Sequence, residues 1–237
     1  MITRQTKALY YSLFSLPMWI NGRIYRSVRQ KRDPIRVQLG PGQKNYIPGW
    51  VNVDANLLTA KIDLWANLEH GLPFRDDSVE RLYSFHVIEH LPDTFLPILF
   101  REMYRVLTPG GAIRVGGPNI DSACQKLLQN DSKWFSDFPD PRLSVGGRFA
   151  NFVFCRNEHL TALTKSYLEE LASSAGFTGV SFCAPVKESI YFDSTVLRLE
   201  HEDDYAFPHS ILLEAKKPLA GRAQAAGGAN ADRKQTS

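Results

Sequence analysis

Short apolar runs alternate with segments of helical period along the middle of this chain, and no other feature constrains its fold as strongly. The strand-length runs are IRVQL (35–39), WVNVD (50–54), VERLYSFH (79–86) and GAIRVGG (111–117). The helical segments are TFLPILFREMYRVLTPGG (94–111) and TKSYLEELASSAGF (164–177), in which apolar residues recur every three or four positions. This alternation is typical of a parallel sheet with both faces covered. We therefore predict an α/β fold with a Rossmann-like, doubly wound, mostly parallel sheet.

Two later runs depart from the alternation. GVSFCAPV (179–186) and HSILLEAKKP (209–218) have strand character, but the loop between them, residues 191–208, shows no helical period. A hairpin connection is sufficient for an antiparallel pair, whereas a parallel pair needs a crossover of a dozen residues or more. We expect the last strand to lie antiparallel to the rest of the sheet.

The ends of the chain differ in composition from its middle, so we divide the 237 residues into three parts. Residues 1–33 form a basic, aromatic helical arm. Residues 34–218 form the folded domain, with an insertion at about 122–160. Residues 219–237 are small, polar and rich in glycine and alanine, and we predict a disordered tail there because they offer little apolar surface to bury.

The arm leaves several alternatives open. Residues 1–36 hold eight basic residues and one acidic residue, although the whole chain has a formal net charge of only +3. This asymmetry indicates one local anionic partner, and we expect no nucleic-acid partner. The apolar run from Ala8 to Ile20 is shorter than the roughly 20 residues that cross a membrane, and no small-residue cleavage site follows it. Docking on a membrane surface through residues 1–36, packing on its own domain or on another subunit, and spanning are the alternatives.

The cysteines indicate a reducing compartment. Cys124, Cys155 and Cys183 lie far apart and have neither the spacing of a disulfide framework nor that of a structural zinc site. We predict a cytoplasmic protein, with membrane association as the alternative that the arm leaves open, and we predict no metal site.

Residues directly after the strands are the candidate ligand-binding residues, because an open parallel sheet binds ligands outside the carboxyl ends of its strands. The first strand runs into Leu39-Gly40-Pro41-Gly42, where the glycines let the backbone approach a ligand closely. The second strand ends in Asp54, an acceptor for two ribose hydroxyls. His86 ends the run VERLYSFH (79–86) and begins the turn HVIEHL.

The glycine pair, the acid at the end of the next strand, LPFRDDS, HVIEHL and FREMYRVLTPGGAI together resemble the class I S-adenosylmethionine-dependent methyltransferases, specifically small members with LPF-x-D-x-S and EH motifs. The resemblance is specific from Ile35 to about Asn119 and looser from Thr164 to Pro218. It implies S-adenosylmethionine as the cofactor and assigns its binding residues. The methionine portion would meet Leu39, Gly40, Pro41, Gly42 and His86, the ribose Asp54, and the adenine Asn67 and Leu68.

Two departures from related patterns help to identify the cofactor. Asn45 stands where a dinucleotide-binding loop has its third glycine, and Pro48 and Gly49 interrupt the helix that normally follows. A dinucleotide would lose the helix terminus that binds its phosphates, whereas S-adenosylmethionine has no phosphate. A nicotinamide-dependent oxidoreductase is therefore the weaker alternative.

Methyl transfer to a hydroxyl also needs a group that takes a proton. The candidates are His86, Glu89, His90 and His159, of which His86 and His159 are our candidate catalytic residues, each with a purely structural role as the alternative. Aromatic residues of the insertion either line an acceptor pocket or form the insertion's own core; they are Trp134, Phe135, Phe138, Phe149, Phe152 and Phe154.

These features predict an enzyme that transfers a methyl group from S-adenosylmethionine to a small-molecule, glycan or lipid-linked acceptor. The alternative is a binding or adaptor protein with the methyltransferase fold and no turnover, because Asn67 replaces the aspartate that relatives use at the adenine.

Overall fold

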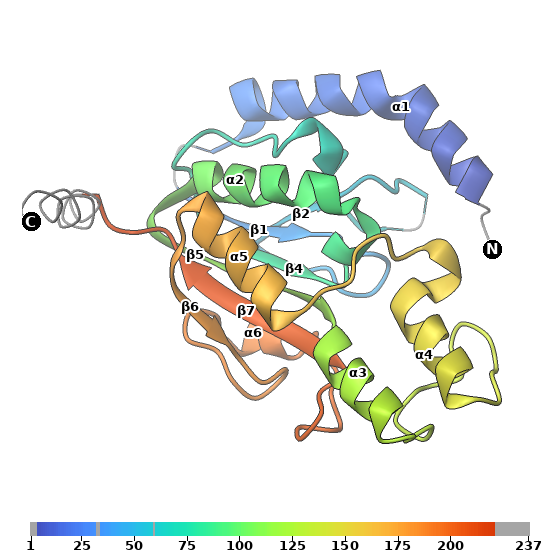
Figure 1. The fold of residues 1–237 in the computed structure, drawn as a ribbon. Helices are drawn as coiled ribbons and strands as arrows, with labels where there is room; N and C mark the ends of the chain where they lie inside the picture. Colours follow the sequence, from blue (N-terminus) through green and yellow to red (C-terminus); the bar gives the residue numbers. More distant parts are fainter. Residues whose placement is uncertain (1–3, 32–33, 59, 221–237) are drawn as a thin grey trace, which may run out of the picture.

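The computed structural model describes residues 4–31, 34–58 and 60–220, so the predicted tail lies almost entirely outside the described residues. Within them, one sheet has the strand order β3-β2-β1-β4-β5-β7-β6 (Figure 1). The strands are β1 Ile35–Leu39, β2 Val51–Asp54, β3 Leu64–Trp65, β4 Val79–Phe85, β5 Leu107–Pro118, β6 Thr178–Phe182 and β7 Ser210–Lys216.

The pairing confirms the predicted fold class. The pairs β1–β2, β1–β4, β2–β3 and β4–β5 are parallel, and β7 lies antiparallel to both β5 and β6. The strand order reverses between β1 and β4, which is the point where such sheets bind ligands.

The helices are α1 Arg4–Ile24, α2 Leu96–Val106, α3 Ile120–Leu128, α4 Val145–Phe154, α5 Lys165–Ala175 and α6 Ser194–Leu197. Single turns of other helical types are η1 Tyr25–Arg29, η2 Leu68–His70, η3 Ile88–His90, η4 Asp93–Phe95 and η5 Cys155–Asn157. Two boundaries differ from the prediction. The helix expected to end at Pro109 and the paired glycines already ends at Val106, since Leu107 pairs with β4. The loop expected at 191–208 contains α6, which is too short to show a period in the sequence.

Helices α2 and α5 lie together over one face of the sheet (Figure 1). The inward face of α2 buries Leu96, Leu99, Phe100, Met103 and Val106, spaced by three and four residues as a one-sided helix requires. Helix α5 begins at Thr164, whose side chain accepts from the N–H of Tyr167, and ends at Gly176 in the left-handed conformation.

The face of the sheet opposite α2 and α5 is not covered by a helix from the β1–β2 connection. Residues 40–50 are turns and bends without helix, as Pro48 and Gly49 predict. Ile47 and Trp50 from this connection pack with Tyr83 of β4 and Val196 of α6. The β6–β7 connection therefore covers the face that a helix after β1 would otherwise cover.

A buried ion triad fastens this connection to the sheet. Arg114 of β5 is fully buried; its guanidinium donates to Glu200 at 2.6 and 2.8 Å and to Glu214 of β7 at 2.6 Å. Glu200 also accepts from the N–H of Val186, and Glu214 from that of Ile190. Burial opposes the charge of Arg114, but the two carboxylates outweigh it and raise the pKa of the guanidinium.

Helix α1 packs on its own domain and forms the outermost layer of the molecule (Figure 1). Met18 is buried, the Asn21 amide donates to the carbonyl of Trp65 at 2.8 Å, and a Cβ on Gly22 would lie 2.9 Å from Cβ of Pro73. No helix in the described part of the chain is long and apolar enough to cross a membrane. The inner side of α1 therefore packs on its own domain, which is one of the alternatives for the arm.

The triad predicts a large stability effect. We expect Arg114→Ala to lower the free energy of unfolding by about 3–5 kcal/mol, because it leaves two buried carboxylates without a cation. Urea unfolding measures the change, and Arg101→Ala, at an exposed position on α2, is the matched control, with an expected effect within about 0.5 kcal/mol. Equal effects of the two substitutions would contradict the role given to the triad.

Candidate active site

The loop after β1 forms one wall of a site at the carboxyl edge of the sheet. Gly40 and Gly42 have φ of +65° and +55°, values that glycine adopts without strain. A Cβ on Gly40 would lie 2.3 Å from Cγ2 of Val87, which follows β4, whereas a Cβ on Gly42 would meet no atom within 4 Å. Gly40 lets the loops after β1 and β4 pack together, and Gly42 leaves open space. Leu39 and Pro41 are buried beside them.

Asp54 ends β2 next to this loop. Its Oδ1 accepts from the N–H of Asn56 at 2.9 Å, and its Oδ2 from that of Gly42 at 3.4 Å. Burial raises the pKa of Asp54, and these backbone hydrogen bonds oppose the rise only in part. In the part of the chain that the structure describes, no side chain donates to this carboxylate, so it keeps acceptor capacity for ribose hydroxyls.

The first half of α1 covers this edge. The Tyr10 hydroxyl donates to the carbonyl of Ala55 at 2.8 Å, and the ring of Phe14 meets that of Trp65 edge-on at 5.6 Å. Burial raises the pKa of Tyr11, and the negative charge of Asp54 raises it further. The Tyr10 hydrogen bond places the first half of α1 beside the residue that follows Asp54, and the side chains of Tyr11 and Phe14 are each 39% exposed.

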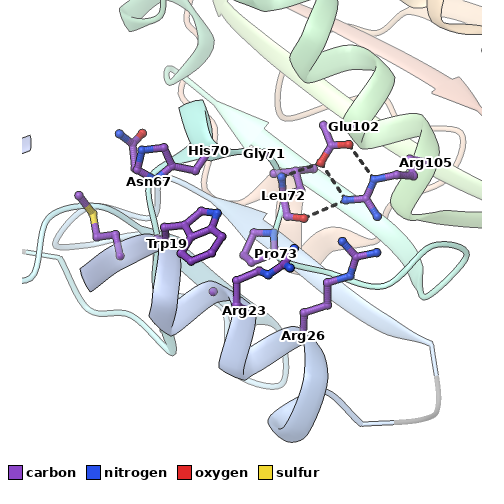
Figure 2. Close-up of a pocket in the computed structure, with 13 residues that line it drawn as sticks. Trp19, Arg23, Arg26, Asn67, His70, Gly71, Leu72, Pro73, Glu102 and Arg105 are labelled. Atoms are coloured by element: carbon purple, nitrogen blue, oxygen red, sulfur yellow. Dashed lines mark hydrogen bonds and ion pairs between the residues drawn. The ribbon is translucent and has the colours of Figure 1, made fainter. Parts of the chain in front are cut away.

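Asn67 and Leu68 begin the η2 turn beside β3, and both are buried. Oδ1 of Asn67 accepts from the N–H of Glu69 at 3.1 Å and caps this turn. Asn67 also lines a cavity beneath α1, together with Trp19 and Arg23 (Figure 2). The assignment of Asn67 and Leu68 to an adenine stays a prediction.

His86 follows β4 and connects the site to β7. Its Nδ1 lies 3.1 Å from Oε1 of Glu89, and its Nε2 lies 3.0 Å from Oγ of Ser210. A carboxylate only accepts, so Nδ1 carries the proton and Nε2 accepts from the serine hydroxyl. The backbone of His86 has φ of +55°, which is a strained conformation for any residue other than glycine. Strained backbone conformations of this kind are often found at functional sites.

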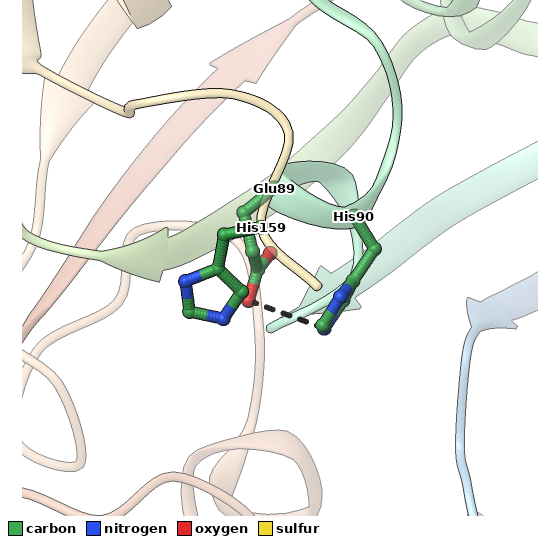
Figure 3. A group of neighbouring side chains, drawn as sticks. All are labelled: Glu89, His90 and His159. Atoms are coloured by element: carbon green, nitrogen blue, oxygen red, sulfur yellow. Dashed lines mark ion pairs between the residues drawn. The ribbon is translucent and has the colours of Figure 1, made fainter. Parts of the chain in front are cut away.

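Glu89, His90 and His159 gather beside His86 (Figure 3). One potential ligand atom from each of the three lies within 4.8 Å of the others. The carbonyl of Glu89 accepts from the N–H groups of Leu160 and Thr161 at 2.7 and 3.1 Å, which holds the end of the insertion against the η3 turn. Burial lowers the pKa of His159, and the charge of Glu89 offsets this effect only in part. The structure thus brings together the four base candidates, from two distant stretches of sequence.

The insertion has its own core. Trp134 and Phe135 are buried with Ala123, and Phe149 and Phe152 pack against them. His209 stacks on Trp134 with ring centroids 4.2 Å apart. These four aromatic residues form the insertion's own core, which is one of the two alternatives for them, whereas the side chains of Phe138 and Phe154 are exposed.

A cleft of about 510 Å³ opens on the far side of Ser210, between α3, the start of α5 and strands β6 and β7. Asn119, Lys165 and Phe207 are among its lining residues. Its volume lies within the range of about 300–1,000 Å³ of pockets that bind small molecules. Since Ser210 contacts both this cleft and His86, the cleft adjoins the candidate base.

The arrangement fits an adenosyl cofactor without phosphates. The open space at Gly42 and the acceptor capacity of Asp54 lie together, and the connection after β1 offers no helix terminus for a phosphate. The sequence pattern assigns no role to Tyr10, which holds α1 to the carbonyl of Ala55, or to Ser210, which contacts His86. Neither residue belongs to a motif, so no signal in the sequence points to them.

Comparison with known proteins agrees with this geometry. Residues 52–115, from β2 into β5, match the family model described as a methyltransferase domain. No curated protein sequence matches the chain. Two solved structures have similar folds at 16% identity and a TM-score of 0.50. An S-adenosylmethionine-dependent methyltransferase from Archaeoglobus fulgidus matches 88% of this chain and 100% of its own. A possible histamine N-methyltransferase from Thermotoga maritima matches 89% and 95%. At this identity the likeness establishes the fold.

The contact between Gly40 and Val87 is testable. We expect Gly40→Ala to cost about 1–3 kcal/mol more in the free energy of unfolding than Gly42→Ala. Both place a Cβ at positive φ, but only the first overpacks the site. Urea unfolding of both variants and of Gly40→Ala/Val87→Ala measures this, and the double variant should recover part of the loss. Equal costs at the two glycines would mean that the loops after β1 and β4 do not pack as described.

Proposed function

We propose that this chain carries a class I S-adenosylmethionine-dependent methyltransferase domain and that it methylates a small-molecule, glycan or lipid-linked acceptor. The observation that carries the proposal is Asp54, a half-buried carboxylate that has no side-chain donor among the described residues and lies beside the open space at Gly42. The two together support binding of the ribose and the methionine portion of the cofactor. The cleft beside Ser210 supports an acceptor of small-molecule size.

S-adenosylmethionine, when bound, supplies a methyl group on a cationic sulfur. The sulfur leaves as a neutral thioether, so no acid is needed to protonate the leaving group. The residues of this chain then have two tasks. Tyr10 and Trp65 both donate to the carbonyl of Ala55 and hold α1 against the edge of the sheet. His86, oriented by Glu89 through Nδ1, presents the lone pair of Nε2 for the proton of an acceptor hydroxyl, in place of the hydrogen bond from Ser210.

Replacement of Asp54 tests the proposed cofactor site. We expect Asp54→Ala to weaken S-adenosylmethionine binding by about 1–3 kcal/mol, the range for losing hydrogen bonds to a buried group. Isothermal titration calorimetry measures the affinity, with Glu169→Ala on the exposed face of α5 as the control. Unchanged affinity in Asp54→Ala would place the ribose elsewhere. No binding by the wild-type protein at millimolar cofactor would favour the adaptor alternative.

The outer side of α1 supports a location at an anionic membrane surface. Leu9, Leu13, Leu16, Ile20 and Ile24 form an apolar stripe on one side of the helix, with exposed fractions between 42% and 64%. Exposed basic residues adjoin its carboxyl end: Arg23, Arg29 and Lys31. Aliphatic side chains beside lysine and arginine suit the boundary between lipid headgroups and acyl chains. A membrane surface as the partner favours the lipid-linked acceptor among the three classes.

Vesicle co-sedimentation tests this location. We expect the wild-type protein to partition onto vesicles with anionic lipid more than onto neutral vesicles. Leu13→Glu/Ile20→Glu should reduce partitioning at least about 10-fold, because two apolar side chains no longer enter the lipid. Leu128→Glu, at an 87% exposed position on α3, is the matched control and should have no effect. Equal partitioning of all three proteins would rule out docking through the stripe.

A further inference from the structure

Two imidazoles and one carboxylate converge beside the methyl-transfer site (Figure 3). We propose that Glu89, His90 and His159 bind one divalent transition-metal ion at the acceptor side of this site. Ligand bonds of about 2.0–2.2 Å in a tetrahedral site place the ligand atoms about 3.4 Å apart. The three ligand atoms lie within 4.8 Å of one another, so side-chain rotations that bring them up to about 1.4 Å closer complete the site.

The backbone prepares both imidazoles as ligands. Nδ1 of His90 lies 2.9 Å from the carbonyl of Glu158, and Nδ1 of His159 lies 3.2 Å from that of Val153. A carbonyl only accepts, so each Nδ1 carries the proton and each Nε2 keeps its lone pair. Nε2 of His90 lies 4.0 Å from Oε1 of Glu89. Metal-binding histidines usually donate their second ring N–H to a carbonyl or a carboxylate in this way.

Glu89 gives the cluster a buried negative charge. Its side chain is 1% exposed, and its Oε2 has no hydrogen-bond partner among the described residues. A Cβ on Gly117 would lie 2.9 Å from this oxygen, so glycine is needed at that position to make room for the carboxylate. A buried carboxylate with an unpaired oxygen is costly, and a cation removes that cost. His86 hydrogen-bonds Oε1 and orients the carboxylate.

The cluster is held rigidly although its members are distant in sequence. Leu160 and Thr161 donate their N–H groups to the carbonyl of Glu89, and the Thr161 hydroxyl donates to that of Leu91 at 2.7 Å. These bonds join the end of the insertion to the η3 turn on both sides of the cluster. Preorganised ligands of this kind lower the entropic cost of binding an ion.

The donor set selects the class of metal. Two imidazole nitrogens and one carboxylate oxygen suit Zn²⁺, Mn²⁺, Co²⁺ or Fe²⁺, whereas Mg²⁺ and Ca²⁺ prefer oxygen ligands alone. Three protein ligands leave positions open for another oxygen, as in catalytic metal sites. Residue spacing in the sequence predicts no such site, because His159 reaches the other two only through the fold.

The position of the cluster suggests its role, which rests on the proposed methyl transfer. Val87 lies between Gly40 and the η3 turn, so the cluster adjoins the loop assigned to the methionine portion of the cofactor. A metal ion there would hold an oxygen of the acceptor next to the methyl donor and favour its deprotonation. The substrate class that follows is an acceptor with a hydroxyl group able to coordinate the ion.

Calorimetric titration of the metal-depleted full chain with ZnCl₂, and separately with MnCl₂ and MgCl₂, tests the site without S-adenosylmethionine. We expect one Zn²⁺ per chain and much weaker binding of Mg²⁺. His90→Ala, His159→Ala and Glu89→Gln should each weaken Zn²⁺ binding at least about 100-fold, since loss of an outer hydrogen-bond partner alone costs about 10- to 100-fold. His86→Ala should fall in that smaller range.

Controls separate this site from adventitious binding and from misfolding. His201→Ala removes an exposed histidine and should leave Zn²⁺ affinity unchanged. His209→Ala tests the neighbouring group of Glu202, Asp203 and His209, so loss of binding there instead would overturn the proposal. Equal affinity in all variants, or no binding by the wild-type protein at millimolar Zn²⁺, would also overturn it. Thermal unfolding in chelator shows whether each variant folds, and cofactor titration in chelator tests the methyl-donor site independently.

Discussion

The sheet depends on one fully buried ion triad. Arg114 lies in the central antiparallel pair, and its guanidinium binds a carboxylate from β7 and another from the segment after α6. Burial of three charges is tolerable only because each has a partner, so the triad specifies one position for the β6–β7 connection. That connection covers the face of the sheet that the short β1–β2 connection leaves bare. The short connection, in turn, leaves the glycine loop without a helix terminus and suits a cofactor without phosphates.

The opposite side of the domain depends on α1. The inner side of this helix packs on β3 and the loop after it, and its first half places Tyr10 on Ala55, directly after β2, and Phe14 against Trp65 of β3. Its outer side presents an apolar stripe beside basic residues. One helix thus contacts the proposed cofactor site on its inner side and presents the surface proposed to meet a membrane on its outer side.

Glu89 is the point where the proposed catalytic residues of the chain meet. Its backbone carbonyl holds the end of the insertion, and its carboxylate orients His86. It shares with His90 and His159 the space in which we propose an ion. The carboxylate oxygen that accepts from His86, Oε1, is also the one that lies 4.0 Å from Nε2 of His90, so one carboxylate would orient the proposed proton acceptor and bind the proposed ion.

The sequence by itself determined the fold class, the antiparallel last strand and the absence of a helix after β1, because hydrophobic period, proline and glycine act locally. It also named Gly40, Gly42, Asp54, His86 and His159, since motif residues follow strand ends. Only the tertiary structure decided that α1 packs on its own domain, that Arg114 pairs with Glu200 and Glu214, and that His159 reaches Glu89. These contacts join residues that are far apart in the chain. Burial and hydrogen bonding in the folded protein select them, and no local period or residue spacing encodes them.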